Sequence, residues 1–187
     1  MTPLRLARHL AAGVLLAVAL TACQDQSASL PPPREPGPDA VGVLCHMALE
    51  DHGGPKGQVF LRLGPNDKDS APLWFSSVRD TFTWLMVDEG LDKAVAAIWV
   101  NDMGRAKNWA HPEAGTWVEA HKALYVIGSD MKAGMGGSEL VPFSDRAAAD
   151  AFAAQHGGRV LGFSQIDRTL LTTLNTSADQ AASAGVK

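Results

Sequence analysis

The chain contains 187 residues, of which 46% are hydrophobic, and its 16 basic and 20 acidic side chains give a net charge of −4. This length is sufficient for one well-cored domain or for two small lobes. The acidic balance argues against a nucleic-acid partner, because binding to phosphates requires an excess of clustered basic side chains.

The N-terminus has the pattern of a secretory signal. Arg5 and Arg8 precede an apolar run that is shorter than the ~20 residues needed to cross a bilayer. The run ends in Leu20–Cys23, which resembles a bacterial lipobox and implies that residues 1–22 are removed and that Cys23 is acylated with fatty acids such as palmitate. The mature chain then carries 14 basic and 20 acidic side chains, a net charge of 14 − 20 = −6.

Acylation predicts that the protein is held in the cell envelope. Each acyl methylene that enters the bilayer contributes about 0.8 kcal/mol to membrane binding. We expect the folded region to face the periplasm. By resemblance to bacterial lipoproteins, Gln24 after the anchor favours the outer membrane over the inner membrane.

Changes in composition mark both ends of the folded region. Residues 23–40 are rich in proline and polar side chains and lack apolar periodicity, so we expect a lipidated, extended tether. Folding is expected to begin near Val41 and to continue to residue 168. Residues 169–187 are mostly small and polar, which predicts a flexible C-terminal tail.

The hydrophobic patterns of the two halves predict similar series of elements. The first half is expected to form strands at 57–63 and Leu73–Phe75, a helix capped by Ser76 or Ser77 and ending at Met86, and a strand at 93–102. The second half is expected to form strands at 115–120, 122–130 and 139–144, a helix at 145–158 closed by Gly157 and Gly158, and a strand at 159–166.

This repetition predicts an α+β fold with mainly antiparallel sheet. In each half, an apolar pair and a Phe-Ser dipeptide stand just before the helix. The pattern indicates a duplicated β-β-α-β unit, arranged either as two lobes, at about 41–110 and 111–168, or as one fused sheet.

Cys45 is the one cysteine that remains if Cys23 is acylated, and an unpaired thiol is exposed to oxidation in the envelope. If residues 43–47 are extended, Cys45 and Met47 point to one face and His46 points to the other. A thiolate and a thioether favour Cu(I), whereas a structural zinc site requires four ligands. The alternative is that both sulfur side chains simply fill the core.

Four stretches resemble the NosL family of lipid-anchored accessory proteins of nitrous-oxide reductase. They are CHMALEDHGGPKGQVFLR, LWFSSVRDTFTW, AAIWVNDMGRAKNWAHPEAGTWVEAHKALYVIGS and GMGGSELVPFSDRAAADAFAAQHGGRVLGF, and the likeness runs from Val43 to Ile166. It implies a Cu(I)-binding metallochaperone for denitrification, which works with the membrane transporter complex that matures the multicopper site of nitrous-oxide reductase. It also implies two β-β-α-β lobes similar to part of the organomercurial lyases.

The same resemblance implies a set of copper ligands. The Cys-x-Met motif of the family falls on Cys45 and Met47, but His46 stands where the family usually has glycine. A further sulfur ligand falls on Met135 of the GMGG motif, with Met131 as second choice. A site with two or three ligands would suit a carrier, because an open position lets a ligand of the partner attack.

Several other side chains have two interpretations. His52 is either a ligand near the site or an exposed loop histidine, and His121 is a second-tier ligand candidate. His156 is expected to interact with the C-terminus of its helix when protonated. Met86 and Met103 are expected to fill gaps in the core.

The sequence contains none of the common motifs for hydrolases, metalloproteases, phosphate binding or dinucleotide binding, so we expect no enzymatic activity. A cysteine-dependent, lyase-like enzyme is disfavoured, because organomercurial lyases need a second cysteine. A structural lipoprotein adaptor of the reductase maturation complex is the main alternative.

Overall fold

The computed structural model of the chain describes residues 30–62, 70–87 and 90–174. The predicted signal sequence, the acylation site at Cys23 and residues 175–187 lie outside the described residues. Among the described helices, none combines the length and the apolar character that spanning a bilayer requires.

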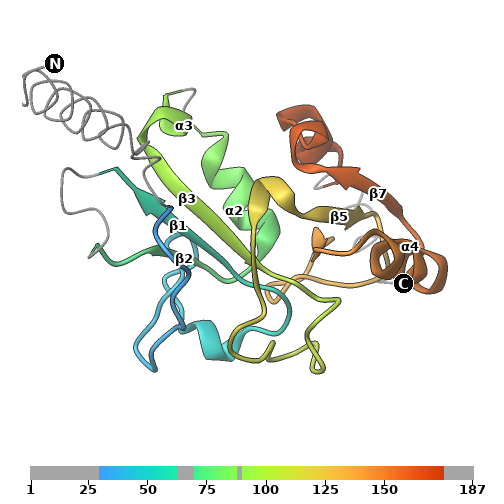
Figure 1. Cartoon of the computed structure of the whole chain (residues 1–187), viewed down its shortest axis with the longest axis horizontal. Coiled ribbons are helices and arrows are strands. Elements are labelled where there is room, and N and C mark those ends of the chain that lie inside the picture. The colour runs from blue at the N-terminus through green and yellow to red at the C-terminus, as the bar shows by residue number, and fades with distance from the viewer. Residues whose placement is uncertain (1–29, 63–69, 88–89, 175–187) are drawn as a thin grey trace, which may run out of the picture. The chain divides into compact units, whose positions relative to one another are not determined.

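The first sheet has four antiparallel strands in the order β2-β1-β3-β4, of which β2, β1 and β3 are labelled in Figure 1. The strands are β1 (Gly57–Leu61), β2 (Leu73–Phe75), β3 (Val95–Asn101) and β4 (Trp117–Glu119). Helix α2 (Val78–Leu85) follows β2 and contacts β1, and the short α3 (Leu91–Ala94) leads into β3. In the centre of the sheet, Val59 lies between Leu73 and Ile98.

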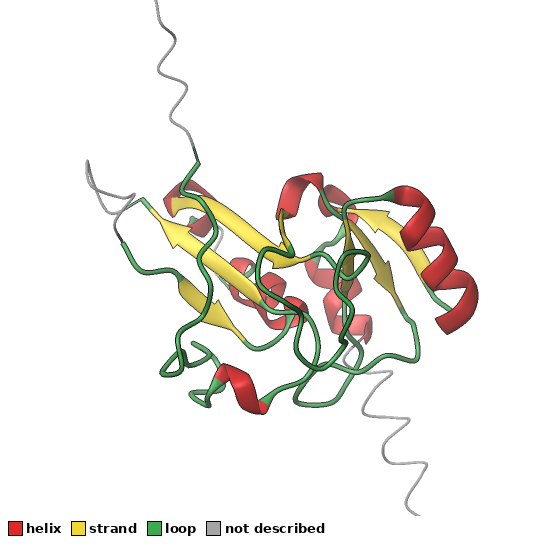
Figure 2. Ribbon diagram, turned by 60° about the horizontal axis from the view of Figure 1, so that its bottom comes forward, coloured by secondary structure: helices red, strands yellow, loops and turns green. Residues whose placement is uncertain are grey.

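The second sheet has three antiparallel strands in the order β6-β5-β7. They are β5 (Leu124–Ile127), β6 (Val141–Phe143) and β7 (Arg159–Gly162), and α4 (Arg146–His156) contacts all three. The described residues also contain the short 3-10 helices η1 (Leu49–Asp51), η3 (Ala120–Lys122) and η4 (Phe163–Gln165). Figure 2 shows the strands of the two sheets in yellow and the long connecting loops in green.

The two halves share one topology, which confirms the predicted α+β fold of antiparallel sheets and β-β-α-β units. In both sheets the first strand of the unit is central, and the second and third strands flank it. The predicted lobe boundary at 110/111 is wrong for β4, because this strand comes from the second half but pairs with β3 of the first sheet. A strand joins whichever edge its side chains can bury against, and Trp117 is buried there.

Capping residues mark the ends of α2 and α4, and of these Ser77 and Gly157 were predicted. The side chain of Ser77 accepts a hydrogen bond from the backbone N–H of Asp80 (3.0 Å) at the start of α2. Asp145 caps α4 in the same way, with 2.8 Å between its Oδ2 and the backbone nitrogen of Ala148. Gly157 ends α4 with a φ of +75°, a backbone conformation that favours glycine.

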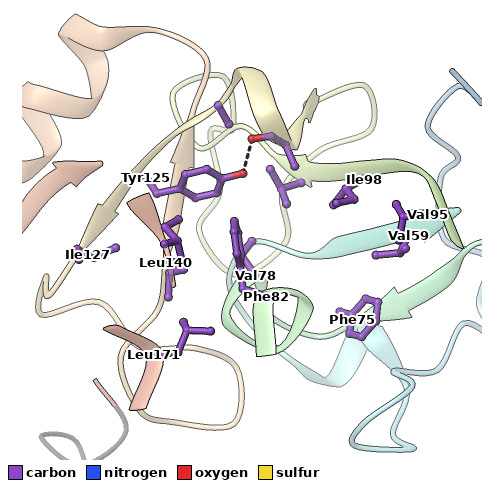
Figure 3. Close-up of a cluster of buried hydrophobic side chains, with 14 residues drawn as sticks. Val59, Phe75, Val78, Phe82, Val95, Ile98, Tyr125, Ile127, Leu140 and Leu171 are labelled. Atoms are coloured by element: carbon purple, nitrogen blue, oxygen red, sulfur yellow. Dashed lines mark hydrogen bonds between the residues drawn. The ribbon is translucent and has the colours of Figure 1, made fainter. Parts of the chain in front are cut away.

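One core joins the two halves (Figure 3). Phe82 of α2 packs edge-on against Tyr125 of β5, with 5.1 Å between the ring centroids. The hydroxyl of Tyr125 donates to the carbonyl of Ala120 (2.7 Å), so this buried polar group is satisfied. Leu140 is completely buried in the same cluster. The lobes are therefore fixed to each other through apolar packing.

The folded region begins about ten residues before the predicted boundary at Val41. Pro31 is buried, and its carbonyl accepts a hydrogen bond from the indole N–H of Trp99 (3.0 Å). The backbone of Arg34 forms two hydrogen bonds with the side chain of Gln58, at 2.9 and 3.0 Å. Backbone groups of this proline-rich stretch form hydrogen bonds with side chains of the sheet instead of pairing with a strand. For this reason the stretch shows no strand pattern in the sequence.

The C-terminal prediction is also wrong in part, because residues 168–174 are helical. Leu171 of this segment is buried, and Leu170 and Leu174 pack against the core that joins the two halves. The segment that carries these leucines is short and its other residues are mostly polar, so the sequence shows no clear helical periodicity there.

Candidate functional site

Cys45 lies in a hairpin formed by residues 40–49, called here the Cys45 hairpin. Val41 and Ala48 pair across it as an antiparallel bridge, and the backbone N–H of Gly42 donates to the carbonyl of Met47 (3.0 Å). The hairpin is attached to β2, because the backbone N–H of Val43 donates to the carbonyl of Trp74 (2.8 Å).

The tip of the hairpin is a turn, so the extended conformation that would place Cys45 and Met47 on one face is not adopted. Residues 43–45 are in turn conformation, and the N–H of His46 donates to the carbonyl of Gly42 (2.8 Å). His46 has a φ of +55° and is the one non-glycine residue with positive φ in the described ranges. Side chains disfavour this left-handed conformation, which explains why glycine would fit here more cheaply.

The thiol of Cys45 points toward the start of α2. Its Sγ lies 3.5 Å from the Oγ of Ser76, which immediately precedes the helix cap Ser77. The carbonyl of Gly42 lies 4.0 Å from the same sulfur, and a Cβ on Gly42 would come within 2.6 Å of it. Because Gly42 has no Cβ, the sulfur of Cys45 can occupy the space beside its backbone.

Met47 does not belong to the core. Its side chain is 42% exposed, next to the exposed Leu44 and Val41 on the same hairpin. Met135 is 55% exposed, and it lies in a second loop, residues 132–138, called here the Met135 loop. Both thioethers are therefore open to a metal ion or to a partner protein.

The Met135 loop is closed at its base by a bridge between Lys132 and Ser138. A Cβ on Gly134 would come within 2.6 Å of the Cβ of His52, and one on Gly137 would clash with the guanidinium of Arg79. The loop thus packs between the segment that carries His52 and the first turn of α2.

The two loops consequently meet at one end of α2. The Cys45 hairpin reaches it through Ser76, and the Met135 loop reaches it through Arg79. The fold thus brings two sulfur-bearing loops, about ninety positions apart in the sequence, to the N-terminal end of the same helix.

His52 is buried, which overturns its interpretation as an exposed loop histidine. It is 4% exposed, and its Nε2 has no hydrogen-bond partner among the described residues. The ammonium of Lys56 donates hydrogen bonds to the backbone carbonyls of His52 (2.5 Å) and Gly54 (2.7 Å). Burial lowers the pKa of Lys56 from 10.5 to about 8, and the negative charge of Glu139 opposes this change.

Glu139 is a buried carboxylate that sequence reasoning missed. It is 0% exposed, and its Oε1 accepts hydrogen bonds from the backbone N–H groups of Arg79 (3.0 Å) and Leu140 (2.8 Å). Its Oε2 is buried without a partner in the described part of the chain. Burial raises the pKa of Glu139 from 4.5 to about 7. No periodicity or motif distinguishes this residue from a surface glutamate.

His121 does not share these contacts. Its Nδ1 lies 2.6 Å from the Oε1 of Glu119, and its ring packs against Phe163 with 4.1 Å between centroids. These contacts hold His121 beside η4. His156, at the end of α4, forms a 3.0 Å contact from Nδ1 to Asp130.

Three other methionines pack into the apolar clusters, as predicted for Met86 and Met103. Met86 packs against the core shared by the two halves, whereas Met103 and the second-choice ligand Met131 pack in a smaller cluster under α4. Across the described ranges, no group of three or more His, Cys, Asp and Glu side chains is arranged to hold a metal ion. The exposed sulfur candidates are therefore those of the two loops.

Comparisons with known proteins agree on one family. The sequence model of the NosL family matches residues 33–171. A copper-binding lipoprotein NosL from Achromobacter cycloclastes is 41% identical over 174 residues, which cover 90% of this chain and 87% of that protein. A copper-binding lipoprotein NosL from Stutzerimonas stutzeri is 37% identical over 163 residues, covering 84% and 79%.

A solved structure agrees with these sequence matches. The crystal structure of the copper chaperone NosL from Shewanella denitrificans is similar with a TM-score of 0.67 and 27% identity. The similarity covers 74% of this chain and 98% of that chain. The range matched by the family model contains both the Cys45 hairpin and the Met135 loop.

Proposed function

The chain belongs to the NosL family, and from this premise we propose that it is a Cu(I)-binding metallochaperone. In this proposal it is a lipoprotein, acylated at Cys23 and held on the periplasmic side of the envelope, with the outer membrane favoured. It delivers copper for assembly of the multicopper site of nitrous-oxide reductase. The proposal assigns the chain no enzymatic step.

The observation that carries this proposal is the convergence of the two sulfur-bearing loops at the N-terminus of α2. Cu(I) is a soft ion that prefers thiolate and thioether ligands. We assign Cys45, Met47 and Met135 as its ligands. His46 and His52 lie on or beside the same loops and are retained as secondary candidates, whereas Met131 and His121 are occupied elsewhere.

Copper capture requires the Cys45 thiol to release its proton, because the thiolate is the ligand. The hydroxyl of Ser76, 3.5 Å away, is suited to donate a hydrogen bond to the sulfur once that proton has left. A site with few ligands on exposed loops leaves one side of the ion open. A ligand of the partner protein can then bind the copper before the donor sulfur leaves.

The same loops supply a surface for docking. Four of the large hydrophobic side chains that are exposed in the described residues belong to them, namely Val41, Leu44, Met47 and Met135. Apolar side chains gathered on a surface are typical of protein–protein contacts. We propose that the membrane transporter of the maturation complex and the reductase itself bind here, around the copper ion.

The proposal is tested with the soluble mature domain, by competition against a Cu(I) chelator in the presence of excess reductant. One Cu(I) should bind per chain, and Cys45→Ser should abolish tight binding. His121→Ala is the matched control, since this exposed side chain contacts Glu119 and Phe163 instead, and it should bind copper as the wild type does. Unchanged affinity in Cys45→Ser would contradict the chaperone function and favour a structural adaptor.

A further inference from the structure

We propose that Glu139 is a positioning residue for the copper site, which holds the Met135 loop against the first turn of α2. In this way the sulfur ligand of the second half, Met135, is held at a fixed position relative to Cys45 and Met47 of the first half. This inference rests on the proposed function and assigns a role to a side chain outside the ligand set.

The first step is the hydrogen bonding of Glu139 itself. The residue follows the Met135 loop directly and precedes β6, and its Oε1 lies 3.0 Å from the backbone nitrogen of Arg79. That nitrogen belongs to the first turn of α2, where helix N–H groups lack partners within the helix. A side chain from the second half of the chain therefore caps the helix of the first half, and a negative charge is favourable there.

The second step is that the loop has further contacts with the same turn. The base of the loop is held by a hydrogen bond from the N–H of Glu139 to the carbonyl of Met131 (3.3 Å). Gly137, with a φ of +73° that favours glycine, lies against the guanidinium of Arg79. The position of the Met135 loop thus depends on the helix turn that Glu139 caps.

The third step connects this turn to the thiol. Ser76 contacts Cys45, and the cap residue Ser77 and Arg79 follow it within the same turn. A displacement of the Met135 loop relative to Arg79 therefore changes its position relative to Cys45. The copper ion would lose a ligand without any change in the ligand residues themselves.

The burial of Glu139 supports a role beyond stability. A fully buried carboxylate with one unpartnered oxygen is less favourable to folding than an apolar side chain of similar size. Its raised pKa reflects this energetic penalty. Side chains that are unfavourable to folding are concentrated at functional sites, where the arrangement they impose is needed.

The test compares Glu139→Gln, Glu139→Asp and Glu139→Ala. Gln keeps an acceptor for both N–H groups and should retain copper affinity. Asp is one methylene shorter and Ala has no acceptor, so both should weaken Cu(I) binding about ten- to hundred-fold, the usual range for groups that orient metal ligands. X-ray absorption of the copper-loaded Asp and Ala variants should show one sulfur neighbour fewer, as in Met135→Ala.

A double-variant cycle separates positioning from general stability. If Glu139 acts through Met135, the double variant Glu139→Ala/Met135→Ala should bind copper no more weakly than Met135→Ala alone. Tyr125→Phe, which removes a buried hydrogen bond to Ala120, is the control and should leave affinity unchanged.

Additive losses, an unchanged sulfur count in Glu139→Asp, or a lost sulfur in Glu139→Gln would overturn the inference. If the Ala variant does not fold, the Gln and Asp variants decide alone. Failure of the proposed function is distinct, because then Cys45→Ser would bind copper as the wild type does.

Discussion

The thiol of Cys45 lies 3.5 Å from the hydroxyl of Ser76, a residue that is 2% exposed and stands just before the cap of α2. In the apo-protein the thiol donates to the Ser76 oxygen. When the sulfur becomes a thiolate, the hydroxyl can reverse its role and donate to it. This contact is therefore stronger in the copper-binding form than in the protonated form.

Ser76→Ala should weaken Cu(I) binding about ten-fold, because a hydrogen bond to a charged group contributes about 1.5–3 kcal/mol. The free energy of unfolding of the apo-protein should fall by about 1 kcal/mol. Chelator competition and urea unfolding measure the two effects. Ser164→Ala, an exposed serine on η4, is the control. Equal affinity in Ser76→Ala and the wild type would show that the thiolate gains nothing from this hydroxyl.

Met47→Ala should separate copper binding from stability. Because Met47 is 42% exposed, its truncation should change the free energy of unfolding by less than about 0.5 kcal/mol while it weakens copper retention. Met103→Ala is the matched comparison, since Met103 packs in the cluster under α4. It should lower stability by about 2 kcal/mol and leave copper affinity unchanged. A large loss of stability in Met47→Ala would show that Met47 packs in the core of the folded protein.

His46→Gly should stabilise the apo-protein by about 0.5–1 kcal/mol. The φ of +55° disfavours a residue with a Cβ, and glycine removes this strain, although it also gains freedom in the unfolded chain. Thermal melting measures the effect. Copper affinity in the same variant tests the imidazole separately, because a ten-fold loss would identify His46 as a ligand. A destabilised His46→Gly would mean that the imidazole makes a favourable contact in the folded hairpin.

The elements that the sequence predicted well are those with local signals. Ser77 and Gly157 mark helix ends through contacts within three or four positions, so the ends of α2 and α4 could be predicted closely. The apolar run at Leu73–Phe75 likewise identified β2. Strand pairing is not local, and for this reason the partner of β4 was not predictable from its own pattern.

The sequence suggested sulfur residues for the candidate site, but it did not predict the geometry of the loops that carry them. Cys45 and Met47 were proposed as ligands because soft sulfur atoms favour Cu(I). The turn between them was not predicted, because it places His46 in a backbone conformation that favours glycine. The burial of His52 and Glu139 arises from tertiary packing of loops, which leaves no period in the sequence.

Glu139 should make the stability of the apo-protein depend on pH in a defined direction. Its pKa is raised from 4.5 to about 7, so the folded protein binds more protons than the unfolded chain between these values. The free energy of unfolding therefore contains a contribution that decreases as the pH rises from 4.5 to 7 and is constant above and below this window.

The variant Glu139→Gln isolates this contribution, because the amide does not ionise. Relative to the wild type, it should gain about 3 kcal/mol between pH 4.5 and pH 7.5, an upper bound set by 1.36 kcal/mol per pKa unit. Urea unfolding of both apo-proteins at several pH values measures the difference, and other carboxylates cancel in the comparison. A difference that does not change with pH would mean that Glu139 keeps an ordinary pKa in the folded protein, despite its burial.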